Sequence, residues 1–431
     1  MRTRDQILSM GTAQAISAGL AVIYSVLAAR GLGPAMRGQF FLIQAFFTVA
    51  SMLVSLSTST IMTVQVSREQ FNLAEVHTSA VLLSVVLGLA GGAVALLVYL
   101  KSFGASSSSL LVLALYFLSL PAMLYKNSWM AIFLGLGRIG ELSIYTVADV
   151  FLTAAGAGIA LYVFHAGLSG MLIMLVIETT TIAVAGVLLT FSVNKTTWQF
   201  SRACITDLLR QGWKQHLATT ATQLYLRADA FILAPFLTPA ALGQYAVARG
   251  LSERVLLAFT PFAQVMFPHI SSRDEMRAKS CTQTTFRQLA GLGIILAAIL
   301  LVVMPWFILL LYGQAYRGAI ILAQILCMAF IVRAITVPIE LWFVGSLLKP
   351  GYNAVTSAFM LGSISILGYI FARHALALGM AVATLVSFAL TLALTIWIGN
   401  AKGLGLRRFV PHAGDLRYVL SEVSQLCLRA F

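Results

Sequence analysis

The chain has 431 residues, is 60% hydrophobic and only 10% charged, and carries a formal net charge of +14. This composition excludes an ordinary soluble domain and is typical of a helical protein that crosses a membrane many times. The positive charge would suit nucleic-acid binding, but its placement along the chain follows membrane topology, so we expect no nucleic-acid partner.

Apolar stretches predict about twelve membrane-spanning helices. The first follows Arg2 and Arg4 and is too long for the core of a signal peptide, so we expect it to stay in the protein. The expected spans cover residues 7–29, 39–66, 77–100, 110–135, 143–164, 167–191, 216–237, 240–267, 286–311, 317–343, 352–372 and 376–399. The expected domains are a six-helix bundle (1–192), a cytoplasmic amphipathic linker (193–215), a second six-helix bundle (216–400) and a basic cytoplasmic tail (401–431).

The linker has an apolar face, since Phe200, Cys204, Leu208 and Trp213 recur at helical spacing. This pattern favours a helix lying on the inner membrane surface, and a plain connection between the bundles is the alternative. The four cysteines have neither metal-ligand spacing nor the pattern of a disulfide framework, and no metal or other cofactor is expected.

Lysines and arginines are distributed unevenly between the two sides of the predicted topology. With the N-terminus inside, about 18 of the 28 lie in cytoplasmic segments and about 5 in the opposite loops. This bias predicts that both termini are cytoplasmic. The outer loops are all short, which leaves no room for an external catalytic domain, and we therefore expect no enzyme activity and no catalytic residues.

Three short sequences recur in the same order in both halves of the chain. Leu32–Phe40 (LGPAMRGQF) matches Leu237–Tyr245 (LTPAALGQY), His165–Met171 (HAGLSGM) matches His374–Met380 (HALALGM), and FLGLG at Phe133 echoes FVGSL at Phe343. The separation of about 205–210 residues covers six predicted helices. An even number of helices predicts two bundles of the same orientation, related by an axis along the membrane normal.

Ten charged residues lie well inside the predicted spans, away from their ends, where an ionised side chain costs at least about 2.5–3.5 kcal/mol. The hairpin 227–271 holds five of them, which predicts that it forms a wall of a polar cavity within the membrane. The cations are Lys126, Arg227, Arg249, Arg254 and Arg333, and the acids are Asp149, Glu178, Asp229, Glu253 and Glu340.

Two groups of motifs decide between fold families. The loop SREQFNLAEVH (Ser67–His77) lacks the charged signature of the major-facilitator fold. In contrast, LAARGLGPAMRGQF, RADAFILAPFLTPAALGQYAVA, FPHIS and LYGQAYRGA resemble the multidrug/oligosaccharidyl-lipid/polysaccharide exporter superfamily, and within it the polysaccharide branch of lipid-linked oligosaccharide flippases. The resemblance extends from Ile7 to about Gly399.

This resemblance implies a V-shaped pair of six-helix bundles in a bacterial inner membrane. It also implies a cargo, an undecaprenyl-diphosphate-linked glycan for O-antigen, capsule or exopolysaccharide synthesis, with membrane lipids, a polysaccharide polymerase and chain-length proteins as partners. A cavity for that cargo needs cations for the diphosphate and hydrogen-bonding groups for the sugars. The candidates are Arg254, Arg249, Arg227, Arg333, Lys126, Tyr245 and Gln223, and the hydroxyl-rich run Ser55–Gln65.

Each candidate also has a structural interpretation. Arg249 is expected to pair with Glu253, four positions further along its helix, whereas Arg254 has no acidic neighbour at that spacing and is expected to contact the diphosphate. Asp149, Glu178 and Asp229 could bind a proton or Na⁺, although pairing of Asp149 and Glu178 with Lys126 is the alternative. The hydroxyls of Ser55–Gln65 could simply pack helices closely. An H⁺- or Na⁺-coupled exporter of small molecules is the alternative function.

Overall fold

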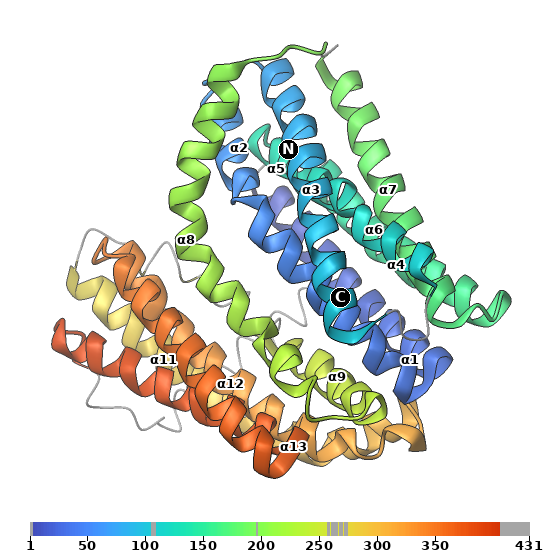
Figure 1. The fold of residues 1–431 in the computed structure, drawn as a ribbon. Helices are drawn as coiled ribbons and strands as arrows, with labels where there is room; N and C mark the ends of the chain where they lie inside the picture. The colour runs from blue at the N-terminus through green and yellow to red at the C-terminus, as the bar shows by residue number, and fades with distance from the viewer. Residues whose placement is uncertain are drawn as a thin grey trace. The chain divides into compact units, whose positions relative to one another are not determined.

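A computed structural model of the chain describes residues 3–104, 109–194, 197–256 and 275–405, together with residues 259, 266 and 270. Within these residues the chain is built of helices joined by short turns, and it contains no strand (Figure 1). The prediction of an all-α membrane protein is confirmed. The chain divides into two compact units, Met1–Arg227 and Ala228–Phe431.

The first unit holds seven helices and most of an eighth. They are α1 (Thr3–Ser55), α2 (Thr58–Ser67), α3 (Leu73–Phe103), α4 (Leu110–Leu118), α5 (Leu120–Gly135), α6 (Ile139–Gly158), α7 (Gly167–Asn194) and α8 (Arg202–Leu233). A π-helical turn, Ile159–Val163, extends α6. The second unit holds the end of α8, α9 (Pro239–Glu253), α11 (Glu275–Leu311), a 3₁₀ turn (Gln314–Tyr316), α12 (Ala319–Gly345) and α13 (Gly351–Ala401).

Eight helical segments among the described residues are long and apolar enough to cross a membrane. Two of them, in α1 and α13, are about twice the roughly 20 residues that a bilayer requires. Each has non-helical backbone near its middle, at Gly33 and at Ala375–Leu376, and so supplies two spans. With α8 and α9, which carry the charged residues of the hairpin, each of the twelve expected spans is represented among the described residues, although most of the end of the span 240–267 lies outside them.

The first sequence repeat marks the start of a helix in both units. Pro34 follows Gly33, whose backbone is non-helical with a positive φ (φ 68°, ψ 172°), and Pro239 follows Thr238, whose backbone is extended (φ −65°, ψ 154°). A proline fits the first turn of a helix because that turn needs no N–H donor. Thr238 also caps α9, since its hydroxyl accepts a hydrogen bond from the N–H of Ala241 at 3.3 Å.

The other two repeats also have matching local structure. Gly167 and Leu376, which occupy the same position of the second repeat, both have left-handed backbone, with φ of 55° and 53°. Gly135 and Gly345, which occupy the same position of the third, are the last residues of α5 and α12. The equivalences predicted from sequence therefore hold at the level of the local backbone.

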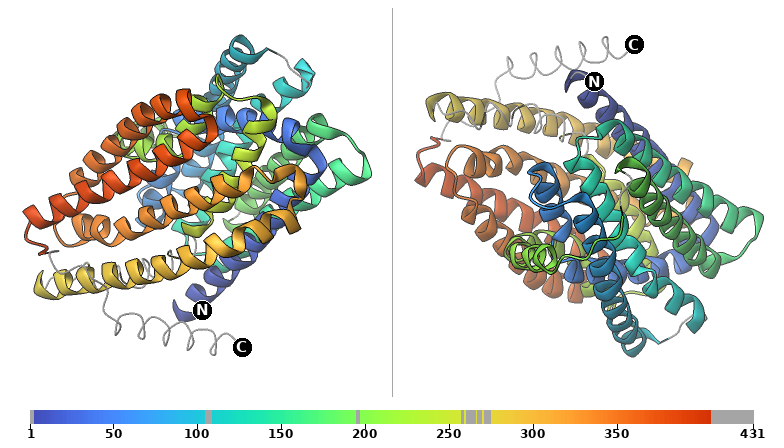
Figure 2. Two further views of the ribbon diagram at one scale, coloured as in Figure 1. Left: turned by 90° about the horizontal axis from the view of Figure 1, so that it is seen from below. Right: turned by 90° about the horizontal axis from the view of Figure 1, so that it is seen from above.

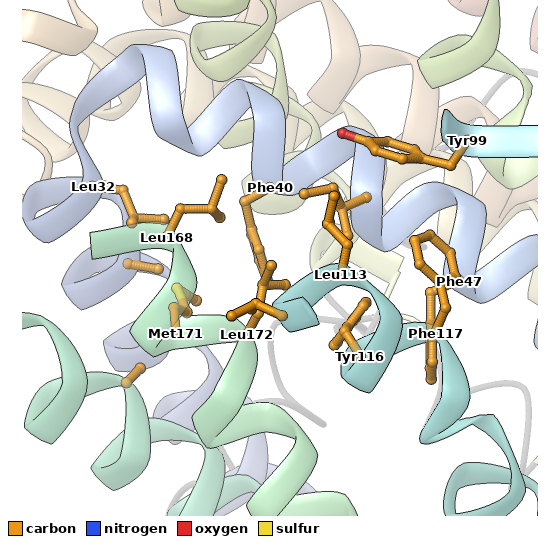
Figure 3. Close-up of a cluster of buried hydrophobic side chains, with 14 of the residues drawn as sticks. Leu32, Phe40, Phe47, Tyr99, Leu113, Tyr116, Phe117, Leu168, Met171 and Leu172 are labelled. Atoms are coloured by element: carbon orange, nitrogen blue, oxygen red, sulfur yellow. The ribbon is translucent and has the colours of Figure 1, made fainter. Parts of the chain in front are cut away.

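A buried apolar cluster holds the helices of the first unit together. It joins Leu32 and Phe40 of α1 to Tyr99 of α3, Phe117 of α4 and Leu172 of α7 (Figure 3). Phe40 is fully buried, as is Tyr245, its counterpart in the repeat of the second unit. The aromatic side chain at this position therefore belongs to the core of each unit.

In the second unit α12 is the central helix, and it packs against α9, α11 and α13 (Figure 2). Its side chains Phe330, Trp342 and Phe343 are fully buried. Large apolar side chains are instead exposed along α11, among them Val302 and Leu310. Exposed apolar surface of this kind suits contact with lipid chains, whereas it would be costly in water.

The predicted amphipathic linker is not a separate element, because the helix that begins at Arg202 continues as α8 to Leu233. Its apolar residues Cys204 and Leu208 are fully buried in an apolar cluster with helices of the first unit. Two residues of the predicted face therefore pack against protein, and the location of this segment at the inner membrane surface stays a prediction. Phe200 and Trp213, assigned to the same face, are exposed. The tail beyond residue 405 lies outside the described residues.

Candidate functional site

Three charged side chains of the first unit meet between α5, α6 and α7. The ammonium of Lys126 contacts the carboxylate of Asp149 and lies 3.1 Å from Oε1 of Glu178. The hydroxyl of Thr179 donates to the other Glu178 oxygen at 3.0 Å. Lys126 and Glu178 are buried, and Asp149 is only slightly more exposed. The structure therefore supports the pairing interpretation of these residues.

This pairing still leaves the cluster with one more carboxylate than ammonium groups. One ammonium neutralises one of the two carboxylates, and a second buried carboxylate is costly unless it gains a proton or another cation. The arrangement can therefore serve as a brace between three helices and can also take up a cation. Both interpretations made from the sequence are compatible with it.

A polar pocket of about 390 Å³ lies in the same unit, beside the predicted hydroxyl-rich run. The helix is interrupted between α1 and α2 at Leu56 and Ser57, which both have left-handed backbone (φ 46° and 51°). Such a conformation costs a residue with a side chain about 1–2 kcal/mol. The polar lining consists of Thr48, Ser51, Ser55, Ser57, Thr58, Ser59, Thr60, Ser84, Asn127, Ser128 and His216.

Hydrogen bonds between side chains hold α8 against α2 close to this pocket. The amide of Gln65 donates to Asp207 at 2.7 Å, and Gln211 donates to the same carboxylate at 2.7 Å. Gly212 approaches the carbonyl oxygen of Leu56 so closely that a β-carbon there would lie 2.5 Å from it. This anchoring places His216, one helical turn further on, in the pocket wall.

In the second unit Arg249 pairs with Asp229, from the preceding helix, at 2.9 Å. The hydroxyl of Tyr245 donates to the same carboxylate oxygen at 2.8 Å, and the guanidinium lies over the ring of Phe330 at 4.7 Å. Asp229, Tyr245 and Arg249 are all buried. The sequence pointed to Glu253 as the partner of Arg249; spacing along one helix could not reveal the acid that tertiary packing supplies.

Arg333 pairs directly with Glu340, with 3.1 Å between the guanidinium and the carboxylate. The two residues lie seven positions apart on α12. Two helical turns rise about 10.5 Å, but the long arginine side chain spans that gap on a helix that contains Pro338. Arg333 also contacts the hydroxyl of Thr336, so its position on α12 is fixed from two sides.

Arg227 and Arg254, the other predicted cations of the hairpin, are less buried than Arg249. Arg254 is half-buried at the end of α9 and donates to the carbonyl oxygen of Gly250 at 2.6 Å. This contact corrects the expectation that no neighbour at helical spacing could pair with it, because a backbone carbonyl does so. Arg227 is half-buried near the end of α8. Gln223 lies in α8, but its side chain is outside the described residues.

Six polar residues that line the pocket lie outside the run predicted from the sequence: Thr48, Ser51, Ser84, Asn127, Ser128 and His216. Ser51 and Ser55 do lie four apart on α1, so helical spacing extended from the hydroxyl-rich run could have identified Ser51. Ser84 and Asn127 come from α3 and α5, and no local pattern connects them to that run. They reach the pocket only through tertiary packing.

The family model described as polysaccharide biosynthesis protein matches residues 4–274. No curated protein sequence matches the chain.

Several solved structures share its fold. The lipid II flippase MurJ in an inward closed conformation has a TM-score of 0.74 at 15% identity, covering 91% of this chain and 87% of that one. An inward-facing multidrug resistance MATE family transporter of the MOP superfamily has a TM-score of 0.73 at 15% identity, with coverage of 91% and 96%. A MOP superfamily transporter from Pyrococcus furiosus, described as having a binding pocket of reverse polarity, has a TM-score of 0.59 at 14% identity, with coverage of 94% and 96%.

Proposed function

Because the chain belongs to the polysaccharide biosynthesis protein family, we propose that it is a flippase for undecaprenyl-diphosphate-linked oligosaccharides. It is a multi-pass membrane protein with the fold of known flippases and exporters. In our proposal it lies in a bacterial inner membrane with both termini in the cytoplasm. It moves the glycan of its cargo to the outer leaflet by alternating access of a central cavity, for O-antigen, capsule or exopolysaccharide synthesis, without catalysing a reaction.

The family match carries this proposal, and the buried polar groups support it. A bilayer tolerates buried charges and a hydroxyl-lined pocket only where they face protein or water, and such groups in a membrane protein mark pathways for polar cargo. The first unit combines both features, the charged cluster at Lys126 and the polar pocket beside Ser55–Gln65. A polysaccharide polymerase and chain-length proteins are partners in this proposal, since they would consume the translocated unit.

We further propose that Arg254 contacts the diphosphate of the lipid carrier, because a half-buried cation within the predicted spans suits an anionic headgroup. Arg254→Gln should accumulate in the membrane at the wild-type level and lose transport. Arg254→Lys should keep part of the activity, since a point cation attracts phosphate but lacks the bidentate geometry of a guanidinium. Normal transport by Arg254→Gln would exclude this role.

A cation-coupled exporter of small molecules is the second candidate. The specific observation in its favour is the pair of carboxylates that share one lysine, Asp149 and Glu178 around Lys126. Such a pair can bind and release a proton or Na⁺, as a coupled exporter requires. Asp229, the other predicted coupling residue, is instead engaged by Arg249 and Tyr245.

Reconstitution distinguishes the two functions. The protein is placed in proteoliposomes with undecaprenyl-diphosphate-linked glycans extracted from the host, and exposure of the glycan to an added lectin is followed with time. A flippase should expose the glycan faster than protein-free vesicles do. A parallel assay follows efflux of a cationic dye under an imposed proton or Na⁺ gradient. Gradient-dependent dye efflux without movement of the glycolipid would replace our proposal with the exporter.

A further inference from the structure

We propose that the polar pocket of the first unit binds a sugar residue of the cargo. This inference deepens the proposed function and rests on it. The pocket is lined by side chains of α1, α2, α3, α5 and α8 and by the break at Leu56–Ser57. Its volume of about 390 Å³ falls within the range of about 300–1,000 Å³ typical of small-molecule sites.

Several hydrogen-bonding groups of the pocket are available to a ligand. Among the described residues, nothing hydrogen-bonds to the side chains of Ser51, Ser59, Thr60, Ser84 or Asn127. Ser51 and Ser84 are 8% and 4% exposed, so two of these side chains belong to largely buried residues. Buried polar groups in proteins are nearly always hydrogen-bonded, which indicates that water or a ligand completes them.

Other hydroxyls of the pocket differ, because they are satisfied within their own helices. Thr48 donates to the carbonyl oxygen of Gln44 at 2.7 Å, and Ser128 donates to that of Leu124 at 2.9 Å. Close packing of helices explains such residues fully. Close packing does not explain the five side chains that have no hydrogen-bond partner. Their presence distinguishes a binding pocket from an interface where small residues only pack closely together.

The chemistry of the lining favours a neutral sugar over a phosphate. None of the described side chains that line the pocket is Lys, Arg, Asp or Glu. Serine, threonine and asparagine each donate and accept hydrogen bonds, as the hydroxyls of a sugar do. Leu83, Leu87 and Met123 supply apolar surface in the same pocket, which suits the C–H faces of a pyranose ring.

The pocket lies well inside the membrane-spanning part of the unit. Ser57 is separated from the turn after α2 by a helix of 10 residues, which rises about 15 Å. Ser84 lies eleven positions into α3, about 16 Å from the same turn. A sugar bound here would therefore lie within the predicted spans, as translocation requires.

Binding of two lipids to purified protein in nanodiscs tests this assignment. The probes are undecaprenyl diphosphate without a sugar and undecaprenyl-diphosphate-linked glycans extracted from the host. Thr60→Val and Asn127→Leu remove hydrogen-bonding groups with little change of volume, and both residues are exposed in the pocket, so folding should be preserved. Each variant should bind the glycan-carrying lipid about five- to tenfold more weakly, the size of one to two neutral hydrogen bonds, and should bind the bare lipid as the wild type does.

Ser67→Ala is the matched control, because Ser67 lies on the same helix as Thr60 but outside the pocket. It should change neither affinity. Wild-type affinity of both pocket variants for the glycan-carrying lipid would overturn the assignment and would leave the flippase proposal intact; the pocket would then hold only water. An equal loss for both lipids would also overturn it. Failure of the wild-type protein to bind the glycan-carrying lipid would instead refute the proposed function itself.

Discussion

The buried pair of Asp229 and Arg249 offers the sharpest test of how the second unit is held together. Both side chains are 3% exposed, and 2.9 Å separates the guanidinium nitrogen from the carboxylate. Arg249→Met keeps the unbranched apolar stem of the side chain but leaves the carboxylate without its cation. Tyr245 and the N–H of Ala230 continue to donate to it, but neither carries charge. Stranding a buried charge in this way costs about 3–5 kcal/mol.

The assay is a thermal unfolding scan of the purified protein in detergent. For a unit of about 200 residues, each kcal/mol shifts the midpoint by about 2–4 °C, so Arg249→Met should lower it by about 6–20 °C. Adding Asp229→Asn removes the stranded charge and should restore most of the loss. Arg317→Met is the control, because Arg317 is exposed in the same unit and its removal should shift the midpoint little.

The double variant decides whether the reasoning is correct. If Arg249→Met with Asp229→Asn is no more stable than Arg249→Met alone, the loss does not come from an uncompensated carboxylate. The pair would then contribute through packing of Arg249 on Phe330, which both variants lose equally.

Three further predictions concern the first unit. Lys126→Met should lower the unfolding midpoint because it leaves two carboxylates together, and Glu178→Gln in the same chain should recover part of the loss. Gly88→Ala should destabilise the unit in the same assay, since the added β-carbon would lie 2.5 Å from the backbone nitrogen of Pro121. In a variant whose native cysteines are replaced, a cysteine at exposed Thr206 should react rapidly with an aqueous maleimide, and one at buried Leu208 should not.

Each of these predictions has its own control. Gly19→Ala places a methyl group where nothing lies within 4 Å, so it should be neutral or stabilising, and an equal effect at Gly88 would contradict the packing argument. Equal labelling at positions 206 and 208 would show that the start of α8 does not pack against the first unit. A Lys126→Met protein as stable as the wild type would show that the acids there tolerate one another without the lysine.

Much of the fold followed from local sequence. The length of the apolar stretches identified the membrane spans, because few structures other than helices of about 20 residues can cross a bilayer. The repeats located helix starts and bends, since Pro34 and Pro239 act through their own rings, and the left-handed backbone at Gly167 recurs at Leu376. The break at Leu56–Ser57 was not foreseen, because neither residue favours left-handed backbone and only packing makes it tolerable.

The candidate site was likewise determined partly by local sequence and partly by tertiary structure. The sequence by itself determined which residues are costly in a membrane, since the charge of Lys126, Asp229 or Arg249 and the apolar stretch around it are both local properties. Only the tertiary structure decided their partners: Arg249 meets Asp229 from another helix, and Lys126 meets acids from two others. It also brought Ser84 and Asn127 to the hydroxyls of α1 and α2. Contacts between helices depend on how whole faces pack, and the spacing of residues along one helix carries no information about which face of another it will meet.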